Sequence, residues 1–299
     1  MNRLVTKHVR LNLPLWLRGF ALLLALATPA LSQPAAKPQS SPSPTGSLPA
    51  RVSETQIDSS IKDDAAVDQM LVAYAPKVRE LATVIGKLKG DLRKGGVGAG
   101  SMGNFVTDGI LFEARQKLGS SVALAVTNAG GLRKNSIAEG DLRLQDIWEL
   151  LPFENALVEF DLTGEQLMTL LKQVVSHRDA QAGARIKYVN TADNRPQLES
   201  ARLLIDGKEQ EIDPNETYKV ICIDYLWKRT ANVESDTEGN YSVLGKGKKI
   251  EPLGLTIRDA MVDYVKKETA AGRDIKSNLD SRFVLDQAGS ANPPEARHD

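Results

Sequence analysis

Residues 122–133 read Val-Ala-Leu-Ala-Val-Thr-Asn-Ala-Gly-Gly-Leu-Arg. The first five residues are apolar and β-prone, which predicts a short strand over 122–126. The strand ends in the turn Asn128-Ala129-Gly130-Gly131, where two adjacent glycines permit a tight change of chain direction. The elements predicted on either side of this strand and turn indicate the class of fold.

On the C-terminal side, strands and helices are interleaved. Residues 157–162 predict a strand that leads into a helix, because Thr163 and Gln166 have the spacing of a capping box. Further elements are expected in this order: a β-hairpin with a tight primed turn at Asp206-Gly207, a strand over 218–227, and a closing helix over 257–268. Strands joined both by helices and by a hairpin predict an α+β fold with mixed sheets.

On the N-terminal side, apolar residues recur at spacings of three and four from Val67 to Ile85, which predicts a helix. A glycine-rich loop over 95–103 precedes a second helix over 104–118, with Asn104 as its expected N-cap. The loop contains a G-x-G-x-x-G pattern, but no buried strand is predicted before it. We therefore interpret it as a loop that caps the next helix and not as a dinucleotide site.

The composition excludes several classes of function. The 299 residues include 38 basic and 38 acidic side chains, so no overall field favours nucleic acid or an anionic membrane. Only His177 and His298 follow residue 32, whereas a two-metal phosphoesterase site needs several His and Asp ligands. We therefore predict no metal site and no cofactor. The single cysteine, Cys222, lies in an apolar run and is expected to be buried on a strand.

The chain divides into four predicted parts. Residues 1–32 combine a basic start, an apolar run over 20–27 and the small residues Ala30 and Ser32, which predicts a cleaved signal peptide. An uncleaved N-terminal anchor is the alternative. Residues 33–60 form a Pro- and Ser-rich linker, 61–287 a folded domain, and 288–299 a disordered tail. We expect a periplasmic or secreted protein with no membrane contact after cleavage.

Four sequence blocks occur in a family-specific order: 102–108 (MGNFVTD), 127–133 (TNAGGLR), 150–167 (LLPFENALVEFDLTGEQL) and 213–218 (DPNETY). Together they resemble the C-terminal, substrate-binding domain of the 5′-nucleotidase family. The resemblance implies a layered α/β/β/α fold with mixed sheets. In full-length members this domain follows an N-terminal metallophosphatase domain, whose Asp and His motifs do not occur in this sequence.

The same resemblance implies a ligand site. Carried over by position, Phe153 and Tyr225 stack on the two faces of a base, and Asn128 and Asn155 form hydrogen bonds with the base edge or the ribose. Arg133 reaches ribose or phosphate oxygens with its planar set of donors.

Three glycines complete the implied site. Gly130 and Gly131 permit the turn that aims Arg133, and Gly183 corresponds to a loop glycine that approaches the base.

The chain departs from the family pattern at two points. Ala231 stands where the family has an aspartate that grips the ribose, and residues 95–101 lack the arginine that usually precedes the first block. Three functions therefore remain open. The favoured one is a domain that binds a nucleotide or nucleoside, together with a separately encoded metallophosphatase. The alternatives are a degenerate domain that serves as an interaction scaffold and a stand-alone hydrolase.

Overall fold

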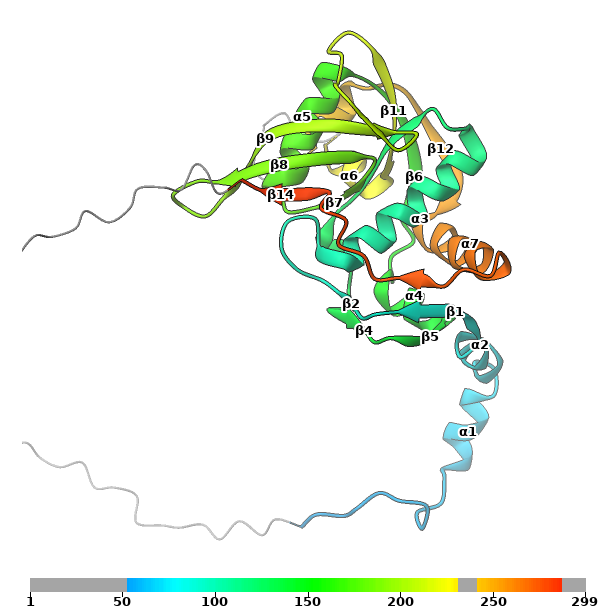
Figure 1. Ribbon diagram of the computed structural model, residues 1–299. Helices are drawn as coiled ribbons and strands as arrows, with labels where there is room; N and C mark the ends of the chain where they lie inside the picture. The colour runs from blue at the N-terminus through cyan, green and yellow to red at the C-terminus, as the bar shows by residue number, and fades with distance from the viewer. Residues whose placement is uncertain (1–52, 231–240, 287–299) are drawn as a thin grey trace, which may run out of the picture. The chain divides into compact units, whose positions relative to one another are not determined.

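The computed structural model describes residues 53–230 and 241–286. The predicted signal peptide, the linker up to residue 52, the tail over 288–299 and position 231 lie outside the described residues. The described residues 53–62 belong to a unit separate from the one that begins at Asp63. All the helices and strands named below belong to the second unit (Figure 1).

A five-stranded mixed sheet organises this unit. Its strand order is β12 (Lys248–Thr256), β6 (Ala156–Thr163), β11 (Thr217–Ile223), β3 (Val122–Thr127) and β7 (Ala180–Ala182). Strands β11 and β3 run parallel, and the other neighbours run antiparallel. Every residue of β3 is buried, which explains why its sequence is a continuous apolar run and does not alternate.

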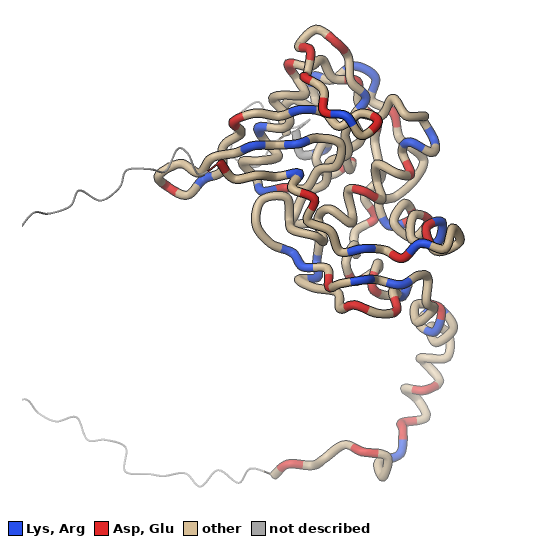
Figure 2. The backbone as a smooth tube through the Cα atoms, viewed as in Figure 1, with Lys and Arg blue, Asp and Glu red and all other residues tan. Residues whose placement is uncertain are grey.

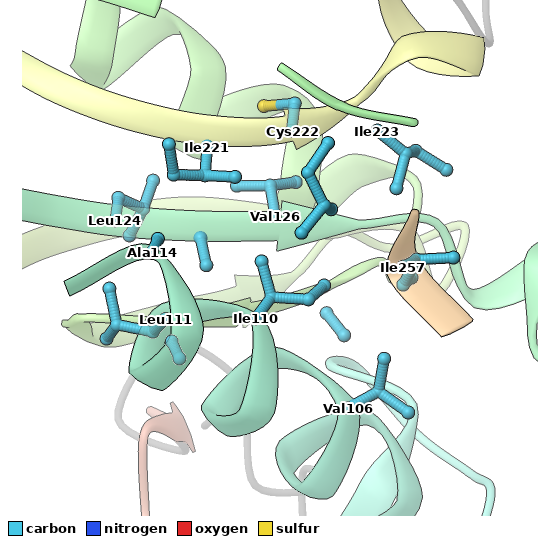
Figure 3. Close-up of a cluster of buried hydrophobic side chains, with 14 of the residues drawn as sticks. Val106, Ile110, Leu111, Ala114, Leu124, Val126, Ile221, Cys222, Ile223 and Ile257 are labelled. Atoms are coloured by element: carbon cyan, nitrogen blue, oxygen red, sulfur yellow. The ribbon is translucent and has the colours of Figure 1, made fainter. Parts of the chain in front are cut away.

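Helices cover both faces of this sheet. Val106, Ile110 and Leu111 of α3 (Gly100–Leu118) face the buried side chains of β3 and β11 (Figure 3). The opposite side of β11 is also buried, and there α5 (Gly164–Ser176) packs against β6 and β11. Helix α7 (Ile257–Ala270) lies beside α3.

Three smaller sheets surround this core. A four-stranded sheet has the order β10 (Lys208–Gln210), β9 (Pro196–Ile205), β8 (Ala184–Asn190) and β14 (Phe283–Leu285). A three-stranded sheet has the order β13 (Ile275–Lys276), β1 (Val84–Lys89) and β5 (Gly140–Arg143), and β2 (Leu92–Arg93) pairs with β4 (Ser136–Ile137). The two larger of these sheets each contain one parallel and at least one antiparallel pair. The expected α+β fold with mixed sheets is therefore confirmed.

The C-terminal segment 274–286 ties these layers together. The carbonyl of Asn278 accepts a hydrogen bond from the buried side chain of Asn104 at 2.9 Å. Arg282 is buried and forms ion pairs with Asp108 at 2.8 Å and with Asp280 at 2.9 Å. The segment contributes β13 as an edge strand of the three-stranded sheet and β14 as an edge strand of the four-stranded sheet.

Two local signals are confirmed by the structure. Thr163 and Gln166 form the predicted capping box at the start of α5. Asp206 and Gly207 both adopt positive φ values, +50° and +75°, as a primed hairpin turn requires.

Two predicted boundaries are wrong. Helix α3 begins at Gly100 and not after Asn104, because Ala99 in the left-handed region starts the helix one turn earlier. The strand expected over 218–227 ends at Ile223, and α6 (Asp224–Thr230) follows it.

The single helix expected over 67–85 is two short helices in the structure. They are α1 (Ala65–Leu71) and α2 (Ala75–Leu81), separated near Pro76, and Ile85 lies on strand β1. No residue of either helix is buried. Among the residues that the structure describes, no helix combines the length and apolar character that a bilayer crossing requires. Lys and Arg are interspersed with Asp and Glu over the described chain (Figure 2).

Candidate functional site

A cavity of about 490 Å³ opens where three segments meet: the turn after β3, the loop after α4 (Leu144–Leu150), and the first turn of α6. Its lining residues are Asn128, Gly130, Gly131, Arg133, Phe153, Asn155 and Tyr225. Seven of the eight residues proposed from the sequence therefore line one cavity.

A larger groove of about 680 Å³ lies on the four-stranded sheet. Its lining contains no aromatic residue, and two of its three cations, Arg185 and Arg202, form ion pairs with Asp280 and Glu211. The smaller cavity offers what a planar ligand needs, namely aromatic faces together with side-chain amides.

The turn after β3 is shaped by a short 3₁₀ helix over Ala129–Gly131. The N–H of Gly131 donates to the carbonyl of Asn128 at 3.1 Å. The side-chain oxygen of Asn128 lies so close beneath Gly131 that a Cβ added there would stand 2.9 Å from it. Only glycine at this position leaves the Asn128 amide where it is. The same oxygen is buried and has no hydrogen-bond partner among the described residues.

Asp179 holds this turn through a hydrogen bond to its backbone. This residue was not among those singled out from the sequence. Its carboxylate accepts a hydrogen bond from the N–H of Ala129 at 2.6 Å and another from the hydroxyl of Tyr241 at 2.7 Å. Burial raises the pKa of Asp179, although both hydrogen bonds lower it. The ring of Tyr241 in turn packs edge-on against His177, the C-cap residue of α5, at 5.2 Å between ring centres.

Arg133 and Phe153 come from neighbouring segments. The N–H of Arg133 donates to the carbonyl of Leu150, the last residue of α4, at 2.9 Å. The Arg133 guanidinium lies 5.9 Å from the centre of the Phe153 ring, at the outer limit of a cation–π contact. The side chain of Phe153 is 49% exposed, so it is not part of the hydrophobic core.

Tyr225 reaches the cavity from a helix and not from a strand. Asp224 begins α6 immediately before it, and its carboxylate accepts from the N–H of Ala156 at 3.1 Å. The carbonyl of Asn155 accepts from the N–H of Ile257 at 2.9 Å. The helix that carries Tyr225 and the loop that carries Asn155 are thus joined at the first residue of β6.

Gly183 does not line the cavity. It links β7 to β8 with a φ of +112°, and an added Cβ would stand 2.1 Å from the carbonyl oxygen of Ala123. The absence of a side chain at Gly183 lets the connection between β7 and β8 pass close to the backbone of β3. Position 231 lies outside the described residues, so the structure does not show what stands in place of the family aspartate.

Two other expectations concern metal and thiol chemistry. Within residues 53–230 and 241–286, no group of three or more His, Cys, Asp or Glu side chains is placed to hold a metal ion. Cys222 is buried on β11 as expected, and burial raises the pKa of its thiol.

Comparison with known proteins points in the same direction. The family model described as 5′-nucleotidase, C-terminal domain, matches residues 81–234. The trifunctional nucleotide phosphoesterase protein YfkN of Bacillus subtilis is 30% identical over 191 residues, which cover 61% of this chain and 12% of YfkN. A 5′-nucleotidase of Vibrio vulnificus is 28% identical over 174 residues, covering 56% of this chain and 30% of that protein.

Solved structures show the same fold. The 5′-nucleotidase precursor from Thermus thermophilus superposes with a TM-score of 0.59 at 24% identity, over 74% of this chain and 43% of that chain. The NAD nucleotidase of Haemophilus influenzae superposes with a TM-score of 0.56 at 19% identity, over 75% and 42%. The chain spans less than a third of these curated relatives and less than half of these structures. With more than half of its residues matched by the family model, the chain belongs to the 5′-nucleotidase C-terminal domain family.

Proposed function

We propose that this chain binds a nucleotide or nucleoside in the cavity between Phe153 and Tyr225. The observation that carries the proposal is convergence: two aromatic side chains from separate segments line the same cavity and remain 49% and 40% exposed. Exposed aromatic side chains of this size gain more from an apolar or planar partner than from water.

The other lining groups match the remaining parts of a nucleotide. Asn128 and Asn155 contribute side-chain amides, groups that can form hydrogen bonds with a base edge, although the side-chain oxygen of Asn128 is itself buried beneath Gly131. The Arg133 guanidinium offers donors to phosphate or ribose oxygens. A nucleotide would therefore place its anionic group at this arginine and its heterocycle beside Phe153.

Two further parts of the proposal rest on the sequence and the relatives. Phosphate cleavage is assigned to a separately encoded metallophosphatase, the partner that the resemblance to the family implies. Export is assigned on the predicted signal peptide over 1–32. The named relatives are nucleotidases and phosphoesterases, which supports a nucleotide as the ligand class.

Calorimetric titration with AMP, UMP and adenosine tests the binding proposal. Phe153→Ala and Tyr225→Ala should each weaken binding by about 1–3 kcal/mol, the range for one base–aromatic contact. Tyr74→Ala is the matched control, because Tyr74 is an exposed aromatic residue that does not line the cavity. Absence of saturation by all three compounds up to millimolar concentration would overturn the proposal.

The scaffold role is favoured by two departures from the family pattern, the alanine at position 231 in place of the aspartate and the missing arginine over 95–101. It predicts that none of the three compounds binds while the fold stays intact. A stand-alone hydrolase would instead release phosphate from AMP in a reaction that a chelator stops.

A further inference from the structure

Arg258 lies in the first turn of α7 and does not line the cavity. It is only 7% exposed. Its Nε donates to the carbonyl of Leu151 at 3.0 Å, and its Nη2 donates to the carbonyl of Pro152 at 2.8 Å. Its guanidinium also lies 4.0 Å from the centre of the Trp148 ring. A buried cation therefore directs two of its donors to the two peptides that immediately precede Phe153.

These contacts lie at the C-terminal end of helix α4 and at the start of loop 151–155, which carries Phe153. Helix α4 ends at Leu150 with Leu151 as its C-cap, and the last carbonyls of a helix lack partners within the helix. A cation at this end is favourable because of the helix dipole. Arg258 satisfies the carbonyl of the C-cap residue and that of the next residue.

The other side of Phe153 is held by the neighbouring residue of α7. The N–H of Ile257 donates to the carbonyl of Asn155 at 2.9 Å. Loop 151–155 is thus fixed before and after Phe153 by two consecutive residues. Their own position is firm, because Thr256 and Asp259 form a capping box and Ile257 is buried in the core.

We infer that Arg258 is the positioning residue that sets where the Phe153 ring stands in the ligand cavity. The effect that we expect Arg258 to have on ligand binding rests on the proposed function. The planar guanidinium is essential to the positioning role, because one flat group reaches two carbonyls while it stacks on Trp148. Lysine keeps the charge but has neither the plane nor the paired donors. Methionine keeps much of the stem but no donor.

A double-mutant cycle with AMP as the probe tests this role in the full chain. Arg258→Met should weaken AMP binding roughly tenfold in the wild-type background and much less in a Phe153→Ala background, because the effect passes through Phe153. In a Tyr225→Ala background the full tenfold loss should remain, since the hydrogen bonds of Arg258 go to the loop that carries Phe153. An equal loss in all three backgrounds, or no loss, would overturn the inference. Arg258→Lys supplies the same cycle should Arg258→Met not fold.

A second measurement needs no ligand. Amide hydrogen exchange in loop 151–155 should become faster in Arg258→Met, while exchange in the turn over 128–133 stays as in the wild type. Unchanged exchange in the loop would contradict the positioning role whatever AMP does. Faster exchange in the loop, combined with a wild type that does not bind AMP, would support the positioning of Phe153 and reject the proposed ligand.

Discussion

Gly130 and Gly131 are adjacent in the turn after β3 but differ in what an added side chain would contact. A Cβ on Gly131 would stand 2.9 Å from the Asn128 side-chain oxygen, and one on Gly130 would stand 3.4 Å from the Asn128 nitrogen, an ordinary contact. The first contact is relieved if the Asn128 amide moves, which costs little stability because the amide is the end of a flexible side chain.

We therefore expect Gly131→Ala to weaken AMP binding severalfold with little change in the free energy of unfolding, and Gly130→Ala to change neither. Calorimetry and urea unfolding on the two variants check this. Equal affinities for the two alanine variants would show that the Asn128 amide does not need its present place.

Asp179 gives a pH-dependent prediction. Burial raises the pKa of its carboxyl above the ordinary value of 3.8, so the folded state binds more protons than the unfolded state just above that pH. The contribution of Asp179 to the free energy of unfolding should then fall as pH rises through this window. Asp179→Asn stays neutral and keeps an oxygen for the Ala129 N–H.

The comparison is made by urea unfolding of both proteins at a series of pH values upward from about pH 4. The wild type should lose stability relative to Asp179→Asn as pH rises. Asp108, whose pKa burial also raises, is present in both proteins and cancels in the difference. Parallel pH profiles would show that the Asp179 carboxyl titrates as an exposed group does.

The two positioning residues show the limit of sequence reasoning at this scale. Phe153 and Arg133 could be placed because they stand in short motifs of fixed order, and Tyr225 because it closely follows the block over 213–218. Asp179 follows the last turn of a helix, and Arg258 lies just after the N-cap of another, where charged residues are ordinarily solvated. The hydrogen bonds that hold them join segments 50 residues apart for Asp179 and Ala129, and 106 residues apart for Arg258 and Pro152, which no local pattern encodes.

Among the elements, those with explicit end signals could be predicted. The capping box of α5 and the Asp-Gly hairpin each depend on a few adjacent residues. The end of β11 could not be predicted, because the apolar, aromatic sequence continues through Tyr225 and Trp227. The strand stops where Asp224 accepts the N–H of Ala156, a contact with a different strand.

Thr163→Ala should lower the free energy of unfolding by about 1 kcal/mol, the usual cost of removing an N-cap hydroxyl. The Thr163 oxygen accepts from the N–H of Gln166 at 3.3 Å at the start of α5. Thr169→Ala, in the same helix, is the control, because its exposed hydroxyl only donates to the carbonyl of Glu165 within the helix. Urea unfolding that gave the same small change for both would argue against the capping contribution.

At the scale of the whole molecule, α1 and α2 stand apart from the core. They contain no buried residue, and Met70 and Val78 are 68% and 62% exposed. Their apolar periodicity predicted helical structure correctly but gives no information on what the apolar face contacts.

A chain that begins at residue 81 should therefore unfold with nearly the same free energy as the full chain, within about 0.5 kcal/mol. Ile275→Ala, which removes a side chain that is 3% exposed in β13, should cost about 2–5 kcal/mol in the same urea experiment. A large loss on truncation would show that α1 and α2 contribute to the core unit.

The C-terminal segment has a consequence for biosynthesis. The carbonyl of Asn278 accepts a hydrogen bond from Asn104, which lies 174 residues earlier in the sequence. Strands β13 and β14 complete two sheets whose other strands are synthesised earlier. Helix α3 and both sheets therefore lack part of their framework until segment 274–286 has been translated. For an exported chain, as we propose, this delay keeps the polypeptide incompletely folded while it is threaded across the membrane.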